Sequence, residues 1–363
     1  MGNVTRENIQ IQNAGSVDKT LALMREKLSK VVPDVELQYK AELAFKINKL
    51  KKELNAVILA HNYMEPALYH SVSDYSGDSL ELARISAKSD ADIIVFCGVR
   101  FMAETAKTLN PDRMVLLPAE KAGCSLAESI TGEDVRKLKE QFPGVPVVSY
   151  VNTYAEVKAE TDYCCTSSNA AAVVRYLADK GHEQIIFLPD EYLAKNVATE
   201  TGIPIIFPSK PHKFKTDDPI NMNRVLLGWH GRCEVHEQFT VEDIENVRRQ
   251  FPDTVILAHP ECSPEVVKAS DFSGSTKQMI NYVRDIDAPR YLLLTECAMG
   301  DNIAAENPHR EMLRLCSVRC PHMNTITLED TLKALELKRF QIKLPPNIIE
   351  KSRKSLDRML EIG

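Results

Sequence analysis

No stretch of this 363-residue sequence is apolar over the length needed to cross a membrane, and it contains no long basic run. Its 45 Lys and Arg residues are outnumbered by 51 Asp and Glu residues, which gives a formal net charge of −6. The first residues are polar, with Asn3, Arg6 and Glu7 among them, and they do not have the pattern of an export signal. We therefore expect neither a membrane partner nor a nucleic-acid partner.

The spacing typical of four-cysteine zinc sites is also missing, because the nine cysteines form no C-x-x-C pair. Nine cysteines without an export signal indicate a reducing compartment, and we expect a cytoplasmic protein. In such a compartment cysteines are buried thiols, metal ligands or catalytic groups more often than disulfides.

Short apolar runs that are rich in Val, Ile and Leu recur along the chain without alternation, as in strands that are buried on both faces. Helical patterns lie between them, for example over residues 170–178, and residues 1–54 have the spacing of a helical preface. Strands that alternate with helices predict an α/β protein with parallel sheets. The strand-like runs are 56–60, 93–97, 114–117, 146–151, 185–188, 204–207, 254–258 and 291–295.

A short frame occurs three times, and it consists of an Asp, an aromatic residue, small residues and then a hydroxyl. A polar pair at the end of a predicted strand precedes each frame, and a cysteine in a polar context follows it further on. This repetition predicts three similar structural units that meet at one centre. The frames are 74–79, 162–167 and 271–276, the pairs are His61 with Tyr63, Tyr150 with Asn152, and His259 with Glu261, and the cysteines are Cys124, Cys233 and Cys320.

The hydroxyls of the frames each lie at the start of a predicted helix. Taken singly, such a residue is an N-cap that contributes about 1 kcal/mol and needs no ligand. Three helix starts around one axis would instead present free N–H groups to an anion, such as a carboxylate or a phosphate. The residues concerned are Ser79, Ser167, Ser275 and Thr276.

The polar pairs follow predicted parallel strands, and ligands of parallel α/β sheets bind at the carboxyl ends of the strands. His and Glu are candidates for acid–base catalysis, and Tyr can donate a proton. One such residue alone is more often structural, but six at three matching positions favour a functional site.

For any one of the three cysteines, a buried and inert thiol is the default interpretation. Three cysteines on a 4Fe-4S cluster would leave one iron without a protein ligand, and that iron can act as a Lewis acid toward a hydroxyl. Cys316 stands four residues before Cys320, so a redox-sensitive pair is a further alternative.

Several stretches together resemble the quinolinate synthase family over about residues 55 to 330. The matching stretches are 59–63, 77–80, 96–106, 122–125, 150–153, 165–170, Cys233 with His236, and 258–262. The resemblance implies three similar three-layer α/β/α domains with parallel sheets around a pseudo-threefold axis. We expect the division to be 1–54 for the helical preface, 55–130 for the first repeat completed by helices of 326–363, 131–235 for the second and 236–325 for the third.

The resemblance further implies a 4Fe-4S cluster on Cys124, Cys233 and Cys320. The implied reaction condenses iminoaspartate with dihydroxyacetone phosphate to quinolinate, phosphate and water. A transient contact with the L-aspartate oxidase that supplies iminoaspartate is expected as well. The alternatives are another iron–sulfur hydro-lyase that acts on a small polyanion, and a non-catalytic iron–sulfur sensor that switches through Cys316 and Cys320.

By the same resemblance, Glu261 is the acid–base residue, Tyr63 and His236 assist proton transfers, and Tyr150 and Asn152 position intermediates. The implied substrate contacts are His61, Ser79, Met102, Tyr150, Asn152, Ser167, His259, Glu261, Ser275 and Thr276. Arg100 and Met64 depart from the usual family pattern beside this pocket.

Overall fold

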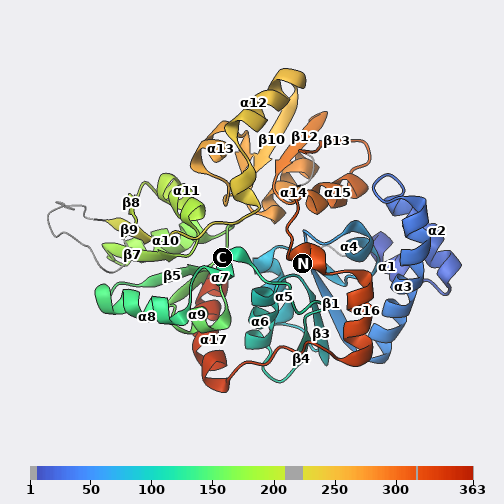
Figure 1. Cartoon of the computed structure of the whole chain (residues 1–363), viewed down its shortest axis with the longest axis horizontal. Helices are drawn as coiled ribbons and strands as arrows, with labels where there is room; N and C mark the ends of the chain where they lie inside the picture. The colour runs from blue at the N-terminus through green and yellow to red at the C-terminus, as the bar shows by residue number, and fades with distance from the viewer. Residues whose placement is uncertain (1–5, 209–223, 316–317, 363) are drawn as a thin grey trace.

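The computed structural model describes residues 6–208, 224–315 and 318–362. Helices and strands alternate along most of this part of the chain, and the strands form three separate sheets. The strands within each sheet are parallel. Figure 1 shows three α/β lobes around a common centre, with the N-terminal helices on the outside of one lobe. The predicted α/β class with parallel sheets is confirmed.

The first sheet has the strand order β2-β1-β3-β4. Its central strands are rich in Val and Ile, and β3 is buried along its whole length, as expected for a strand covered on both faces. The elements of this unit are β1 (Ala56–His61), α4 (Pro66–Ser71), β2 (Tyr75–Gly77), α5 (Ser79–Ser86), β3 (Ile93–Cys97), α6 (Arg100–Leu109) and β4 (Met114–Leu116).

The second sheet has the order β6-β5-β7-β9-β8. Its elements are α8 (Gly132–Gln141), β5 (Val147–Tyr150), α9 (Ala155–Ala159), β6 (Tyr163–Cys165), α10 (Ala170–Asp179), β7 (Gln184–Leu188), α11 (Glu191–Thr201), β8 (Ile205–Ile206) and β9 (Val225–Gly228).

The third sheet repeats the first, with the order β11-β10-β12-β13. Its elements are α12 (Val241–Gln250), β10 (Thr254–Ala258), α13 (Pro264–Ala269), β11 (Phe272–Ser273), α14 (Thr276–Asp285), β12 (Arg290–Leu294), α15 (Cys297–Glu306) and β13 (Glu311–Leu313). Ile256 and Leu292 pack in a cluster with residues of α12 and α13, whereas Leu257 and Leu293 pack in another with residues of α14 and α15. Alternate residues of the strands therefore enter two apolar layers, which is the three-layer arrangement that the family resemblance implies.

The remaining helices flank the units or connect them. α16 packs on α3 and on β3 of the first unit, whereas α17 packs on α9 and β6 of the second unit and also on α6 of the first. α3 itself packs on β1 and α4 of the first unit. α17 therefore joins two units, and the division into domains given above stays a prediction. These elements are α1 (Arg6–Gln12), α2 (Val17–Leu28), α3 (Asp34–Glu53), α7 (Ser125–Glu128), the short 3-10 helices η1 (His236–Gln238) and η2 (Met323–Thr325), α16 (Leu328–Leu337) and α17 (Pro346–Ile362).

The three repeated frames do more than lead into helices. The aromatic residue of each frame begins a short edge strand, namely β2, β6 or β11, which pairs with the first strand of its unit. The apolar runs of the sequence predict no strand there, and they predict neither β9 nor β13. None of the described helices combines the length and the apolar character that a membrane span requires.

Candidate active site and metal centre

A cavity lies where the three units meet, and residues of every unit line it. Nearly all the residues singled out in the sequence face this one space: His61, Tyr63, Ser79, Met102, Cys124, Tyr150, Asn152, Ser167, Cys233, His236, His259, Glu261, Thr276 and Cys320. The expected convergence of three repeats on one centre is therefore present in the structure.

Ser275 is the one predicted site residue that does not line the cavity. It is the N-cap of α14, where its hydroxyl accepts a hydrogen bond from the backbone N–H of Gln278 and donates to Asp78 Oδ2 at 3.1 Å. The capping interpretation therefore describes Ser275 well, and the neighbouring Thr276 supplies the hydroxyl that faces the cavity.

Two buried histidines at strand ends present the same nitrogen to the cavity. His61 Nδ1 accepts the backbone N–H of Tyr63 at 3.2 Å, and His259 Nδ1 accepts that of Glu261 at 3.3 Å. Burial lowers the pKa of each imidazole to about 3, so both rings are neutral near pH 7. A neutral ring that accepts at Nδ1 carries its proton on Nε2, which makes both residues hydrogen-bond donors toward a ligand.

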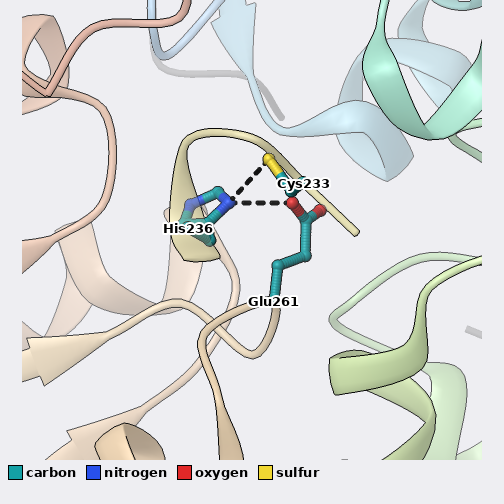
Figure 2. Close-up of side chains that lie close together, drawn as sticks. All are labelled: Cys233, His236 and Glu261. Atoms are coloured by element: carbon teal, nitrogen blue, oxygen red, sulfur yellow. Dashed lines mark hydrogen bonds and ion pairs between the residues drawn. The ribbon is translucent and has the colours of Figure 1, made fainter. Parts of the chain in front are cut away.

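Glu261 is the carboxylate on which most polar contacts of the cavity converge. Its Oε1 accepts hydrogen bonds from Tyr150 Oη at 2.5 Å and from Asn152 Nδ2 at 3.3 Å. Its Oε2 lies 2.8 Å from His236 Nδ1 (Figure 2). Burial alone would raise the pKa of Glu261, but His236 and the hydrogen bonds that His236 and Tyr150 donate lower it. The group is therefore an ionised carboxylate near pH 7.

A second set of contacts connects Tyr63 to His236. Tyr63 Oη lies 2.5 Å from Thr295 Oγ1 and 3.4 Å from His236 Nε2, and Thr295 Oγ1 lies 2.9 Å from His236 Nε2. Burial and the charge of Glu261 raise the pKa of Tyr63 well above its ordinary value, so the phenol keeps its proton. Thr295 is a site residue that the sequence analysis missed, although it is the first polar residue after the apolar run of β12.

The hydroxyls near the helix starts occupy three different positions. Ser79 is the first residue of α5, which Asp78 caps, and Thr276 is the first residue of α14. Ser167 precedes α10, which begins after Asn169, and its Oγ lies 3.4 Å from His259 Nε2. Ser79, Ser167 and Thr276 therefore line the cavity, whereas Ser275 is an N-cap outside its lining.

The three cysteines that line the cavity occur in equivalent turns. Their carbonyl oxygens each accept the backbone N–H four residues later, from Glu128, Glu237 and Asn324, at 3.0 Å in every case. Each cysteine thus begins one helical turn, and the backbone N–H groups two and three residues later donate to its sulfur. Such donors stabilise a thiolate, and hydrogen bonds to sulfur are typical of iron–sulfur sites.

Without a metal, these thiols would stay protonated. Burial is the main cause that raises the pKa of Cys124 to about 12, that of Cys320 to about 11 and that of Cys233 well above its ordinary value. A bound metal ion holds such sulfurs as thiolates. Cys124, Cys233 and Cys320 are free thiols, as are Cys97, Cys164, Cys165 and Cys262, which are buried outside the cavity lining. Three unpaired thiols with N–H donors in one cavity fit a cluster with three cysteine ligands. Cys316 lies outside the described residues.

A more specific sequence pattern also marks these three cysteines. Each stands seven residues before a Thr that caps the next helix, in the pattern Cys-x6-Thr-x-Glu-Asp. Asp134, Asp243 and Asp330 each donate their backbone N–H to that Thr side chain. The rest of the chain contains no cysteine in this pattern.

A mononuclear alternative shares part of this site. Cys233, His236 and Glu261 have ligand atoms within 4.8 Å of one another, which is close enough to hold a single metal ion. Figure 2 shows that Cys233 and His236 come from one loop and that Glu261 reaches them from the loop after β10. The iron and zinc contents of the purified protein distinguish this site from a cluster.

The two residues that depart from the family pattern do not line the cavity. Arg100 Nε pairs with Glu104 at 2.9 Å, and the other oxygen of Glu104 accepts the backbone N–H of Ala155. Met64 is fully buried in the core of the first unit.

Comparisons with known proteins agree with this site. Residues 45–361 match the profile of a family described as quinolinate synthetase A protein. The chain is 47% identical over 347 residues to quinolinate synthase 2 of Mesorhizobium japonicum, which covers 96% of this chain and 99% of that protein. It is 48% identical to the quinolinate synthase of Agrobacterium fabrum, with 94% and 92% covered, and 45% identical to that of Caulobacter vibrioides, with 95% and 89% covered.

The fold and the cavity define an α/β enzyme in which three repeated units build one central site. The chain belongs to the quinolinate synthase family, whose members are enzymes of NAD biosynthesis. The family resemblance noted in the sequence is thereby confirmed.

Proposed function

We propose that this enzyme condenses iminoaspartate with dihydroxyacetone phosphate. The carbon atoms of both substrates, and the nitrogen and carboxylate oxygens of iminoaspartate, enter quinolinate. The phosphoryl group leaves as phosphate, and the carbonyl and hydroxyl oxygens of dihydroxyacetone phosphate leave as water. The observation that carries the proposal is the meeting of Cys124, Cys233 and Cys320 with the Glu261 carboxylate in one buried cavity.

We propose that the three cysteines hold a 4Fe-4S cluster. When bound, a cluster with three protein ligands supplies one open iron as a Lewis acid toward a substrate hydroxyl. The free state of the thiols, their equivalent turns and the N–H groups that face their sulfurs support this assignment.

The chain offers donors for the substrates' anionic groups on the other walls of the cavity. His61 and His259 would each direct an Nε2–H toward a carboxylate or a phosphate. The first turns of α5 and α14 add backbone N–H groups beside Ser79 and Thr276, and helix N-termini favour negative charge. Met102 and Ser167 would complete this part of the pocket.

Ring formation requires protons to leave carbon and nitrogen and to reach departing oxygens. Glu261 would accept a proton, because it is a buried carboxylate already oriented by Tyr150 and Asn152. His236 can pass a proton between Glu261 at Nδ1 and Tyr63 at Nε2, and the Tyr63 phenol would donate to a leaving hydroxide. Tyr150 and Asn152 would also hold intermediates in place.

The test is turnover by iron-loaded protein prepared without oxygen. With dihydroxyacetone phosphate and iminoaspartate made in situ from oxaloacetate and ammonia, we expect quinolinate detected by chromatography. Dihydroxyacetone without its phosphate serves as the control and should give none. Iron-loaded protein that forms no quinolinate would contradict the proposal.

The same assay separates the alternatives. Another hydro-lyase would leave these substrates unchanged, and a non-catalytic sensor would turn over neither them nor a related polyanion. A cytoplasmic location and a transient contact with an L-aspartate oxidase are compatible with this function and remain proposals.

A further inference from the structure

A group of charged side chains lies just outside the cavity, behind the loop that carries Cys233. At its centre is Glu191, the first residue of α11, which is only 5% exposed. Its carboxylate lies 2.6 Å from Lys195 Nζ, 3.1 Å from His230 Nδ1 and 3.3 Å from both Nε and Nη2 of Arg232. Arg232 directly precedes Cys233.

The backbone of this loop is held at the same place. The N–H of Glu191 donates to the carbonyl of Gly231 at 2.8 Å, and the N–H of Gly231 donates to the carbonyl of Pro189 at 3.0 Å. A side chain at Gly231 would come within 2.6 Å of the Pro189 carbonyl oxygen and of Ser129 Oγ. The two segments therefore lie too close together for a side chain at position 231.

The other side of the loop is connected to a second cysteine turn. Ser125, which follows Cys124, donates from Oγ to the Arg232 carbonyl at 3.4 Å and accepts from the backbone N–H of Glu234 at 3.3 Å. Arg232 and Glu234, the residues on both sides of Cys233, are thus both hydrogen-bonded to Ser125, and Arg232 also pairs with Glu191. The guanidinium of Arg232 also lies 4.7 Å from the ring centre of Tyr192.

The charge of Glu191 persists at any pH where the enzyme would work. Burial alone would raise the pKa of Glu191, but Lys195, His230 and Arg232 lower it to about 2. Removing these partners would leave an uncompensated charge buried in the protein, which would lower its stability. The folded state therefore favours the contact between Glu191 and Arg232. A guanidinium with two donors on one carboxylate is also fixed in direction.

We propose that Glu191 is a positioning residue for the metal centre, because it fixes Arg232 and thereby the direction in which the Cys233 sulfur enters the cavity. This inference rests on the proposed cluster. It assigns to Glu191 a role in how firmly the cluster is held, with no contact to substrate or to iron.

The test uses Glu191→Gln, which keeps the size of the side chain and removes its charge. Iron release from the anaerobic holoenzyme to a chelator is followed by the loss of visible absorbance. We expect release about tenfold faster than in the wild type, as the loss of one charge-assisted hydrogen bond implies. The control is Glu200→Gln at the far end of the same helix, where an exposed carboxylate pairs with Arg175. It should release iron at the wild-type rate.

Arg232→Met breaks the same contact from the other side and should by itself release iron about tenfold faster than the wild type, which keeps the inference testable if Glu191→Gln fails to fold. An Arg232→Met rate within twofold of the wild type would overturn the inference. If Glu191 acts through Arg232, the double variant releases iron no faster than Arg232→Met alone. Additive effects, or a Glu191→Gln rate within twofold of the wild type, would overturn the inference. Wild-type protein that takes up no iron would overturn the proposed cluster together with this inference.

Discussion

Glu261 shows how the cavity prepares a single residue for chemistry. Two donors from the end of β5 and one from the loop after β9 reach its two oxygens, so its orientation is set before any substrate arrives. A group oriented in advance does not have to reorganise during the reaction, which favours catalysis.

Replacing Glu261 by Gln keeps the shape of the side chain but removes its ability to accept a proton. We expect kcat to fall by about 10²- to 10⁴-fold, the usual contribution of a positioned acid–base group. Initial rates of quinolinate formation measure this effect. The iron content should stay at the wild-type level, because Glu261 is not among the proposed ligands.

The exposed Glu242 on α12 provides the matched control, and Glu242→Gln should have wild-type kcat. If Glu261→Gln retained wild-type kcat with full iron content, Glu261 would not be the acid–base residue.

Residues at strand ends could be predicted from the sequence, because a polar pair after an apolar run marks the edge where parallel strands place their ligands. Thr295 could not be chosen in the same way, because its role depends on Tyr63, which is 232 positions away in the chain. The sequence also could not show which of Ser275 and Thr276 lines the cavity, because both lie at the start of one helix. The orientation of that helix determines which hydroxyl faces the cavity.

At the scale of secondary structure, the Asp of each frame has a structural role, because it connects two neighbouring strands. Its backbone N–H donates to a residue near the start of the neighbouring strand, and its carboxylate accepts the N–H of that same residue. The pairs are Asp74 with Ile58, Asp162 with Val147 and Asp271 with Ile256, all with N···O distances from 2.8 to 3.0 Å. Each Asp therefore fixes the register of an edge strand.

We expect Asp162→Ala and Asp271→Ala each to lower the free energy of unfolding by roughly 1–3 kcal/mol, because a strand N–H loses its acceptor. Urea unfolding of the holoenzyme measures the loss. Asp253→Ala is the control, since that carboxylate is 50% exposed and only pairs with Arg290. It should cost less than about 1 kcal/mol. Equal effects in all three variants would show that the frame carboxylates do not fix the strands.

Long apolar runs predicted the central strands, because burial on both faces leaves a continuous apolar pattern. The edge strands β2, β6 and β11 are only two or three residues long and carry the small residues of the frame, so periodicity could not reveal them. β13 is similarly short, at three residues.

At the scale of the whole molecule, the three cysteines lie where the chain passes from one unit to the next. The turn of Cys124 leads into α8 of the second unit, that of Cys233 into α12 of the third, and that of Cys320 into α16. α16 packs on β3 of the first unit, which closes the circle. A cluster at the centre would therefore connect all three units.

The content of iron and acid-labile sulfide per chain after anaerobic purification tests this account most directly. We predict about four irons and four sulfides, as a cubane cluster requires. The cluster should be absent from the Cys124→Ala, Cys233→Ala and Cys320→Ala variants and retained in Cys97→Ala and Cys164→Ala. A wild-type protein with one zinc and no sulfide would instead indicate the mononuclear site of Cys233, His236 and Glu261, and it would contradict the central claim.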